Sequence, residues 1–192
     1  MYEVNAQYKG LVPVMFDRFF NIEDTQGRAK KKSKDSWKDI LPLKMYIDKK
    51  GVYVPTDNIR MMLIGNKHRK GAAKILGSFV EKGKGVEYME FCKSCVWVLG
   101  EQDPQKAYFG PARETYDDYD ERSFINAMGS RSLTRRPILT TPWTVSFRVQ
   151  VTDDQMHESK LREMFVIAGL RCGLGAYGPT FGRCELLQWK PI

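Results

Sequence analysis

The stretch Trp143–Thr152, WTVSFRVQVT, alternates strictly between apolar and polar side chains. Its apolar members, from Trp143 to Val151, fall on every second position, and polar residues occupy the positions between them. Successive side chains of a β-strand point to opposite faces, so this pattern predicts a strand with one buried face and one face open to water.

A helix and a second strand are predicted directly after it. The pair Asp153–Asp154 marks a helix start, and apolar residues then recur at the spacing of one helix face. The residues expected to point inward are Met156, Leu161, Met164, Phe165 and Ala168. A glycine-rich loop, RCGLGAYGPTFGRC at 171–184, follows, and RCELLQWKPI at 183–192 is predicted as the final strand. The chain therefore ends in a strand–helix–strand unit.

The first half of the chain predicts further strands and an amphipathic helix. The N-terminal segment opens with a strand that is broken at Gly10 and Pro13, and LKMYIDKKGVYVP at 43–55 is typical of a hairpin. Residues 55–57 then end the strand and offer an N-cap for a helix from about Asn58. Its expected buried stripe is Ile59, Met62, Leu63 and Ile64. The run VEYMEFCKSCVWVLG at 86–100 is interpreted as a strand.

Two segments lack apolar periodicity and are predicted to be insertions in a single domain that spans 1–192. Residues 24–39 carry a lysine run and predict an exposed loop. Residues 101–136 mix an acidic stretch with Arg131, Arg135 and Arg136, and we interpret them as a long excursion from the core.

The charge balance favours a polyanionic partner. Lys and Arg outnumber Asp and Glu by 31 to 23, which gives a net charge of +8 and a pI near 9.3. No apolar run approaches the roughly 20 residues of a membrane span, and the N-terminus lacks an apolar secretory core. We therefore expect a cytoplasmic protein without a membrane partner, whose four cysteines are reduced thiols.

The glycine-rich loop leaves two compatible interpretations open. Its spacing Gly173-x-Gly175-x-x-Gly178 matches the dinucleotide-binding fingerprint, but the loop follows a helix and opens a strand, the reverse of the order that this motif needs. The simpler interpretation is a helix C-cap at Gly173 or Gly175 and a tight turn. The functional interpretation is that backbone amides approach phosphates there, with charge from Arg171 and Arg183 and a stacking face from Tyr177.

Cysteines and histidines give no firm catalytic or metal site. Cys92-x-x-Cys95 looks like half a zinc site, but on a strand these side chains point to opposite faces, and Cys172 and Cys184 lack a matching close spacing. We therefore expect buried thiols, no metal and no cofactor. His157 is expected to be solvated. His68, inside KHRK at 67–70, is either a general base for RNA cleavage or part of a basic face, and this cluster is either the last turns of a helix or a loop.

Two stretches together resemble the RAMP superfamily, the RNA-binding backbone subunits of CRISPR effector complexes. GVYVPTDNIRMML at 51–63 resembles its PYIPGSSLKGALR signature, and GLGAYGPTFGRCEL at 173–186 resembles its C-terminal glycine-rich loop. With YKGLVPVMFDRF at 8–19, they also resemble a group of small phage proteins over most of the chain. The resemblance implies an α+β, ferredoxin-like (RRM-like) core, in which helices cover one face of an antiparallel sheet and long loops or hairpins are inserted. Arg60 falls on the helix lysine of the superfamily, whereas its target-cleaving aspartate has no counterpart motif here.

These observations predict a non-catalytic protein that binds single-stranded RNA or DNA and assembles as a homo-oligomer side by side along the strand, in the host cytoplasm if it is phage-encoded. The predicted contact residues are Arg60, Lys67, His68, Arg69, Lys70, Arg131, Arg135, Arg136, Arg171, Gly173, Gly175, Tyr177, Gly178, Gly182 and Arg183. Two alternatives stay open: a metal-independent endoribonuclease that uses His68, and a phage structural or host-defence-interaction protein.

Overall fold

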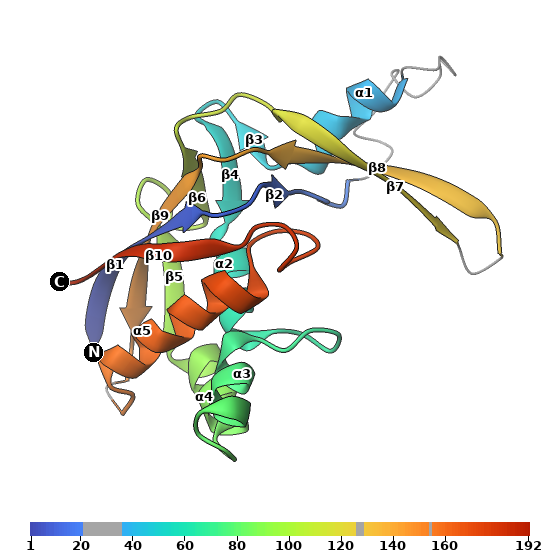
Figure 1. Ribbon diagram of the computed structural model, residues 1–192. Coiled ribbons are helices and arrows are strands. Elements are labelled where there is room, and N and C mark those ends of the chain that lie inside the picture. The colour runs from blue at the N-terminus through green and yellow to red at the C-terminus, as the bar shows by residue number, and fades with distance from the viewer. Residues whose placement is uncertain (21–35, 126–128, 154) are drawn as a thin grey trace.

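The computed structural model describes residues 1–20, 36–125, 129–153 and 155–192, and it has an α+β fold with antiparallel sheets (Figure 1). In these ranges the strands are β1 (Tyr2–Gly10), β2 (Val14–Met15), β3 (Ile47–Asp48), β4 (Gly51–Pro55), β5 (Val96–Gly100), β6 (Lys106–Gly110), β7 (Asp118–Ile125), β8 (Arg131–Leu139), β9 (Thr144–Val151) and β10 (Cys184–Pro191). The α-helices are α1 (Ser36–Ile40), α2 (Thr56–Ile64), α3 (Ala72–Phe79), α4 (Gly85–Ser94) and α5 (Glu158–Ile167). A 3-10 turn covers Leu41–Lys44, and a π-helical turn covers Ala168–Cys172.

The centre of the molecule is a ferredoxin-like sheet. Four of its strands lie in the order β10-β1-β9-β5, and every neighbouring pair is antiparallel. Along the chain these strands alternate with helices as β1, α2 to α4, β5, β9, α5 and β10, which is the β-α-β-β-α-β connectivity of that fold. The predicted fold class is therefore confirmed, and so is the strand–helix–strand unit at the end of the chain.

The helix-covered face of the sheet forms the core. The apolar positions of β9 are buried as predicted, and they lie opposite the buried residues of β1, with Val4 beside Val149 and Ala6 beside Phe147. Phe165 of α5 stacks on Phe147, with 5.8 Å between the ring centroids. The helix α5 begins at Glu158 rather than at Asp153, because His157 acts as its N-cap and accepts a hydrogen bond from the Ser159 N–H. The five residues expected to point inward are all buried.

The opposite face of β1 and β9 is polar. Gln7 Nε2 donates to Ser146 Oγ at 2.8 Å, and Gln150 Nε2 donates to Glu3 Oε1 at 3.0 Å. RRM domains bind RNA through aromatic side chains on this face of the sheet. The two central strands of the present sheet carry no aromatic side chain there, whereas Trp97 of β5, opposite Gln150, and Tyr108 of β6 fall on the same face.

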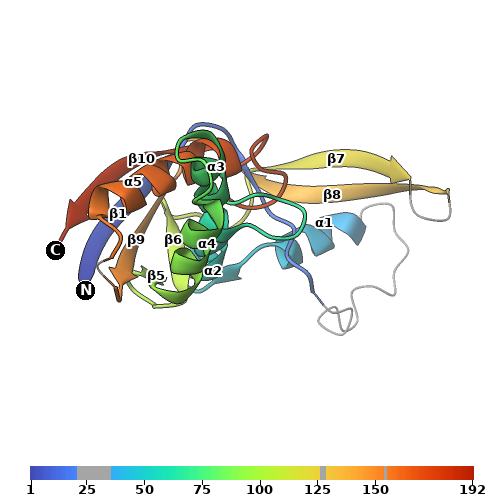
Figure 2. The ribbon, with the colours of Figure 1, turned by 90° about the horizontal axis from the view of Figure 1, so that it is seen from below.

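A second sheet projects from the core. The strands β2, β8 and β7 pair in that order, and the β7–β8 hairpin points away from both chain termini (Figures 1 and 2). The main sheet is also extended beyond β9 by β6, β4 and β3. The hairpin predicted over 43–55 is confirmed, since β3 pairs with β4 from Ile47 opposite Val52.

Three local predictions were wrong or fall partly outside the described residues. The run 86–100 is not one strand: Gly85–Ser94 is the helix α4, and its buried residues Tyr88 and Cys92 are four positions apart, the spacing of one helix face. Residues 101–136 are not a single excursion from the core, because β6 belongs to the main sheet; β7 and part of β8 form the projecting hairpin. Of the loop predicted over 24–39, only residues 36–39 are described, and they belong to α1.

Candidate nucleic-acid interface

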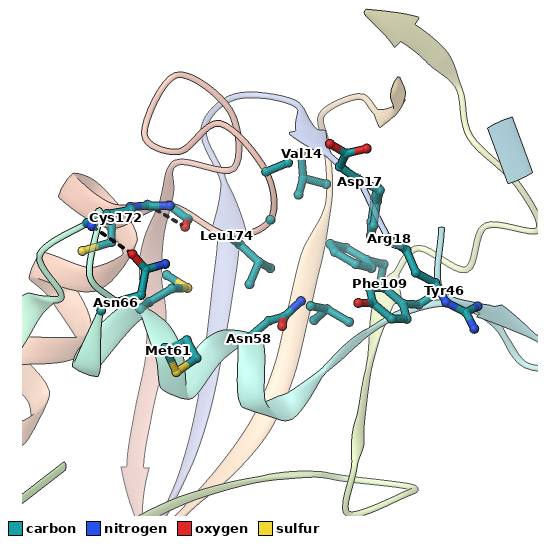
Figure 3. Close-up of a pocket in the computed structure, with 18 of the residues that line it drawn as sticks. Val14, Asp17, Arg18, Tyr46, Asn58, Met61, Asn66, Phe109, Cys172 and Leu174 are labelled. Carbon is teal, nitrogen blue, oxygen red and sulfur yellow. Dashed lines mark hydrogen bonds between the residues drawn. The ribbon is translucent and has the colours of Figure 1, made fainter. Parts of the chain in front are cut away.

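A cavity of about 280 Å³ lies at one end of the sheet, between α2 and the glycine-rich loop (Figure 3). Three stretches far apart in sequence form most of its wall: residues around β2, the helix α2 with the turn at 65–70 that follows it, and the loop at 172–176. Tyr46, Val54 and Phe109 complete the wall. Figure 3 shows Leu174 of the loop above Asn58 and Met61 of α2, with Arg18 and Tyr46 at the far end.

The helix α2 contributes one of its faces to the cavity. Asn58, Met61, Met62 and Gly65 line it, at positions i, i+3, i+4 and i+7, which lie above one another on a helix. Residues two positions apart do not share a face, so Arg60 is turned away from Asn58. The helix begins at Thr56, two residues earlier than predicted, and the predicted stripe of four apolar residues is buried.

The glycines of the loop allow its backbone conformation. Gly173 ends the π-helical turn with φ +70°, and Gly175 and Gly182 have φ +78° and +70°, values that side-chain-bearing residues rarely adopt. The simpler interpretation of the loop, a C-cap at Gly173, is therefore confirmed. A side chain at Gly178 would come within 2.5 Å of the Arg69 guanidinium, so glycine there lets Arg69 cross the loop.

Several backbone amides of the loop are used within the protein. The N–H groups of Gly173, Leu174 and Ala176 donate to the carbonyls of Ala168, Gly182 and Met15, at 2.8 to 2.9 Å. These three groups are not free to hold a phosphate, so the expected cradle of backbone amides is wrong at these positions. Positive charge at this cavity comes instead from side chains.

Arg69 joins the turn at 65–70 to the glycine-rich loop. Its Nη2 donates to the Gly173 carbonyl at 3.2 Å. The turn itself is closed by Asn66, whose Oδ1 accepts hydrogen bonds from the backbone N–H groups of His68 and Arg69 at 2.8 and 2.9 Å. The cluster at 67–70 is therefore a compact turn, which resolves the two alternatives that the sequence left open.

Three cations and one carboxylate line the cavity. Arg18, Arg69 and Lys70 are the cations, and Asp17 is the carboxylate. Asp17 is neutralised, because Arg136 Nε lies 2.7 Å from its Oδ2 and Lys44 Nζ lies 3.9 Å from its Oδ1. The net charge of the cavity is therefore positive.

The structure brings only part of the predicted set together here. Arg69, Lys70, Gly173 and Gly175 line the cavity, and Lys67 and His68 are exposed on the same turn. Gly178 and Gly182 belong to the loop but not to the cavity wall. Arg183 is exposed beyond it, and its carbonyl accepts a hydrogen bond from Leu11 at 2.9 Å.

The remaining predicted arginines lie elsewhere. Arg60 packs over the Trp97 ring at 4.7 Å and donates to the Lys93 carbonyl, so it does not reach the cavity. Arg171 lies over Phe79 at 5.8 Å, towards α3. Arg135 pairs with Glu121 at 2.5 Å on the β7–β8 hairpin, and Arg131 is exposed on β8.

Tyr177 is already in contact with cations. The guanidinium groups of Arg122 and Arg136 lie 5.0 and 4.9 Å from its ring centre, and 48% of the residue is exposed. Cation–π contact of this kind holds the glycine-rich loop against the base of the hairpin. Arg136 was predicted to contact the nucleic acid directly. It also forms an ion pair with Asp17, and its contact with Tyr177 positions the loop.

Sequence reasoning missed Arg18, Asn58 and Asn66. The helical repeat from Thr56 was the available signal for Asn58, because it separates the face of Asn58 and Met61 from the face of Arg60. No local pattern marked Arg18, which reaches the cavity only through tertiary folding; its guanidinium lies 5.4 Å from the centre of the Tyr46 ring.

Over the described ranges, no group of three or more His, Cys, Asp or Glu side chains is arranged to hold a metal ion. The thiols of Cys92, Cys172 and Cys184 are buried, and burial raises the pKa of each, that of Cys92 to about 12. None of the helices in the part of the chain described here has the length and apolar character that crossing a bilayer requires.

Comparison with known proteins supports the fold. No protein-family model matches the chain, and no curated protein matches it. Among solved structures, a chain in the cryo-EM structure of the type III-B Cmr-beta complex bound to cognate target RNA is similar, with a TM-score of 0.50 and 13% sequence identity. The match covers 100% of the present chain but 60% of that chain, so the present chain spans about three fifths of its length. At this sequence identity the likeness shows a shared fold alone.

Proposed function

We propose that this protein binds single-stranded nucleic acid in the cavity between α2 and the glycine-rich loop, without cleaving it. The observation that carries the proposal is the gathering of Arg18, Arg69 and Lys70 at a cavity whose one carboxylate, Asp17, is neutralised by Arg136 and Lys44. Contacts to phosphate oxygens from Arg and Lys supply most of the sequence-independent affinity for nucleic acid.

The chemistry of the cavity also suits a nucleic-acid strand. Pockets for drug-sized ligands measure roughly 300–1,000 Å³, so the present cavity of about 280 Å³ is at the lower limit of that range. Its wall offers the amide groups of Asn58 and Asn66 for polar contacts and the partly buried ring of Tyr46 for a base. One nucleotide of a longer strand is an occupant with these properties.

The polar face of the sheet also favours the cavity as the binding site. Since β1 and β9 lack aromatic side chains on the open face, the bases of a single-stranded nucleic acid would find no stacking partner on β1 or β9. The cavity beside the helices offers both charge and an aromatic ring. The solved neighbour is a chain from a complex bound to target RNA, and this favours RNA over DNA as the partner.

Two finer parts of the proposal rest on the resemblance described above. We propose that copies of the chain assemble side by side along a strand, as the RAMP resemblance implies. The origin in a phage, the host cytoplasm as its location and the phage structural or host-defence role stay predictions.

The proposal is tested by anisotropy titration of a labelled single-stranded RNA and a DNA of the same sequence, at several salt concentrations. The triple variant R18A/R69A/K70A is compared with the wild type and with K49A/K190A, which removes two exposed lysines outside the cavity wall. Each lost phosphate contact lowers the salt slope by about 0.7, so we expect a fall of about 2 for the triple variant and little change for the control.

Absence of binding to both strands at low salt would overturn the proposal. Equal slopes for the wild type and the triple variant would do the same, once thermal melting shows that both are folded. Because Arg69 also holds the glycine-rich loop, R18A/K70A is measured beside the triple variant and should lose about 1.4 of the slope.

Cleavage is tested separately, because His68 is exposed on the turn beside the cavity. Labelled RNA is incubated with the protein in EDTA, and we expect it to stay intact. Cuts that His68→Ala abolishes would instead favour the endoribonuclease alternative.

A further inference from the structure

A second groove, of about 460 Å³, lies at the ends of α3 and α4. Lys70, Lys74 and Lys82 line it, together with Gly77, Gly83 and Gly85. Lys70 also lines the cavity described above, so the two hollows share a wall. The function proposed so far does not use this groove.

The lysines of the groove are not neutralised. Within the described ranges no carboxylate lines the groove, and no ion pair involves Lys70, Lys74 or Lys82. The neighbouring acid, Glu81, is bound on another side by Lys160 and by the Tyr88 hydroxyl. Hydrogen bonds from Lys160 and Tyr88 lower the pKa of Glu81, so it stays ionised and committed to these partners.

Glycines leave the floor of the groove bare. A side chain at Gly77 would collide with the backbone of Gly85, so glycine at 77 allows α3 and α4 to pack closely. Gly83 has φ +93° and open space where its side chain would be. Backbone is therefore accessible at the exposed Gly83, whereas Gly77 is buried where the two helices meet.

An exposed aromatic ring lies next to the groove. Phe79 is 70% exposed and follows Ser78, which lines the groove, but Phe79 is not itself part of the groove wall. Arg171 lies 5.8 Å from the centre of this ring. A cationic groove with an exposed aromatic side chain at its edge is the combination that binds single strands, because phosphates pair with the cations and a base stacks on the ring.

We infer that the strand held in the first cavity continues along this groove, past Lys70, with phosphates at Lys74 and Lys82 and a base on Phe79. The inference rests on the function proposed above and extends its footprint to a second stretch of the strand. In this arrangement Arg171, which does not line the first cavity, lies at the edge of the bound nucleic acid.

The test is a series of single-stranded oligonucleotides from about 4 to 16 nucleotides, the range of site sizes among single-strand-binding folds. Affinity is measured for the wild type, K74A/K82A, F79A and the control K49A/K190A. For the wild type we expect affinity to rise with length until both hollows are filled. K74A/K82A should bind the shortest oligonucleotides as tightly as the wild type does, but its affinity should not rise with oligonucleotide length. On long oligonucleotides its salt slope should fall by about 1.4.

F79A should bind long oligonucleotides about tenfold more weakly, with the salt slope unchanged, because it removes stacking and no charge. If K74A/K82A and F79A match the wild type at every length, the inference is wrong while the first cavity stands. An equal loss at all lengths also contradicts it, since the groove would then not be an extension. If the wild type binds no oligonucleotide, the proposed function itself fails.

Discussion

At the scale of single residues, position on the backbone decides which charges act together. Arg69 reaches the cavity because Asn66 closes the turn beneath it and Gly178 leaves room for its guanidinium. Arg60 carries the same charge on the neighbouring helix and is committed to Trp97 and the Lys93 carbonyl. Charge alone is therefore a poor guide to the site, and the helix face on which a residue lies is a better one.

The thiols give a residue-scale prediction. Cys92, Cys172 and Cys184 are buried and burial raises the pKa of each, whereas Cys95 is partly exposed. Only the thiolate reacts with alkylating agents, so we expect one thiol to be labelled quickly in the folded protein at neutral pH. Mass spectrometry should place this label at Cys95, and Cys95→Ser should remove it. Rapid labelling of two or more thiols in the native state would contradict the described packing.

At the scale of elements, one turn ties the added strands together. Asp48 of β3 accepts hydrogen bonds from Lys106 and Tyr108 of β6, at 2.8 and 2.9 Å, and from the backbone N–H of Lys50. These bonds, that of Lys106 above all, lower the pKa of Asp48 from 3.8 to about 2. The folded state therefore favours the ionised carboxylate more strongly than the unfolded chain does.

The sign of this shift gives a prediction for acid. The contribution of Asp48 is fully present above pH 3.8 and is lost as the pH falls towards 2. Denaturant unfolding at stepped pH values should show the stability of the wild type falling over this interval. Asp48→Asn should be less stable at neutral pH and should lose less stability over the same interval. Parallel pH profiles for the two proteins would show that the Asp48 bonds do not contribute.

Element-scale patterns predicted much of the core and little of its additions. The alternation in β9 and the apolar spacing in α5 follow from one buried face each, and both were read correctly. The helix α4 was missed because aromatic and β-branched residues such as Val86 and Phe91 suggest a strand, although Tyr88 and Cys92 lie at helical spacing. The β7–β8 hairpin projects from the core, so it buries no continuous apolar face that a periodic pattern would reveal.

At the scale of the whole molecule, folding joins segments that sequence proximity does not connect. The cavity brings Arg18 beside residues from 58 to 70 and from 172 to 176. The resemblance pointed to two of these segments, the helix and the glycine-rich loop, but not to the part of each that lines the cavity. The glycine-rich loop, the turn at 65–70 and the β7–β8 hairpin all project on the side away from the chain termini (Figure 1). A single-stranded nucleic acid bound on this side would leave both chain termini uncovered.

The central claim is that a single strand lies between α2 and the glycine-rich loop rather than on the open sheet face. The most direct measurement is ultraviolet crosslinking of a uridine-rich oligonucleotide, followed by mass spectrometry of the crosslinked peptides. We predict crosslinks in residues 46–70 and 171–183, where Tyr46, Met61 and Tyr177 are available, and their loss in R18A/R69A/K70A. Crosslinks concentrated in β1 and β9, and unchanged in that variant, would contradict the account.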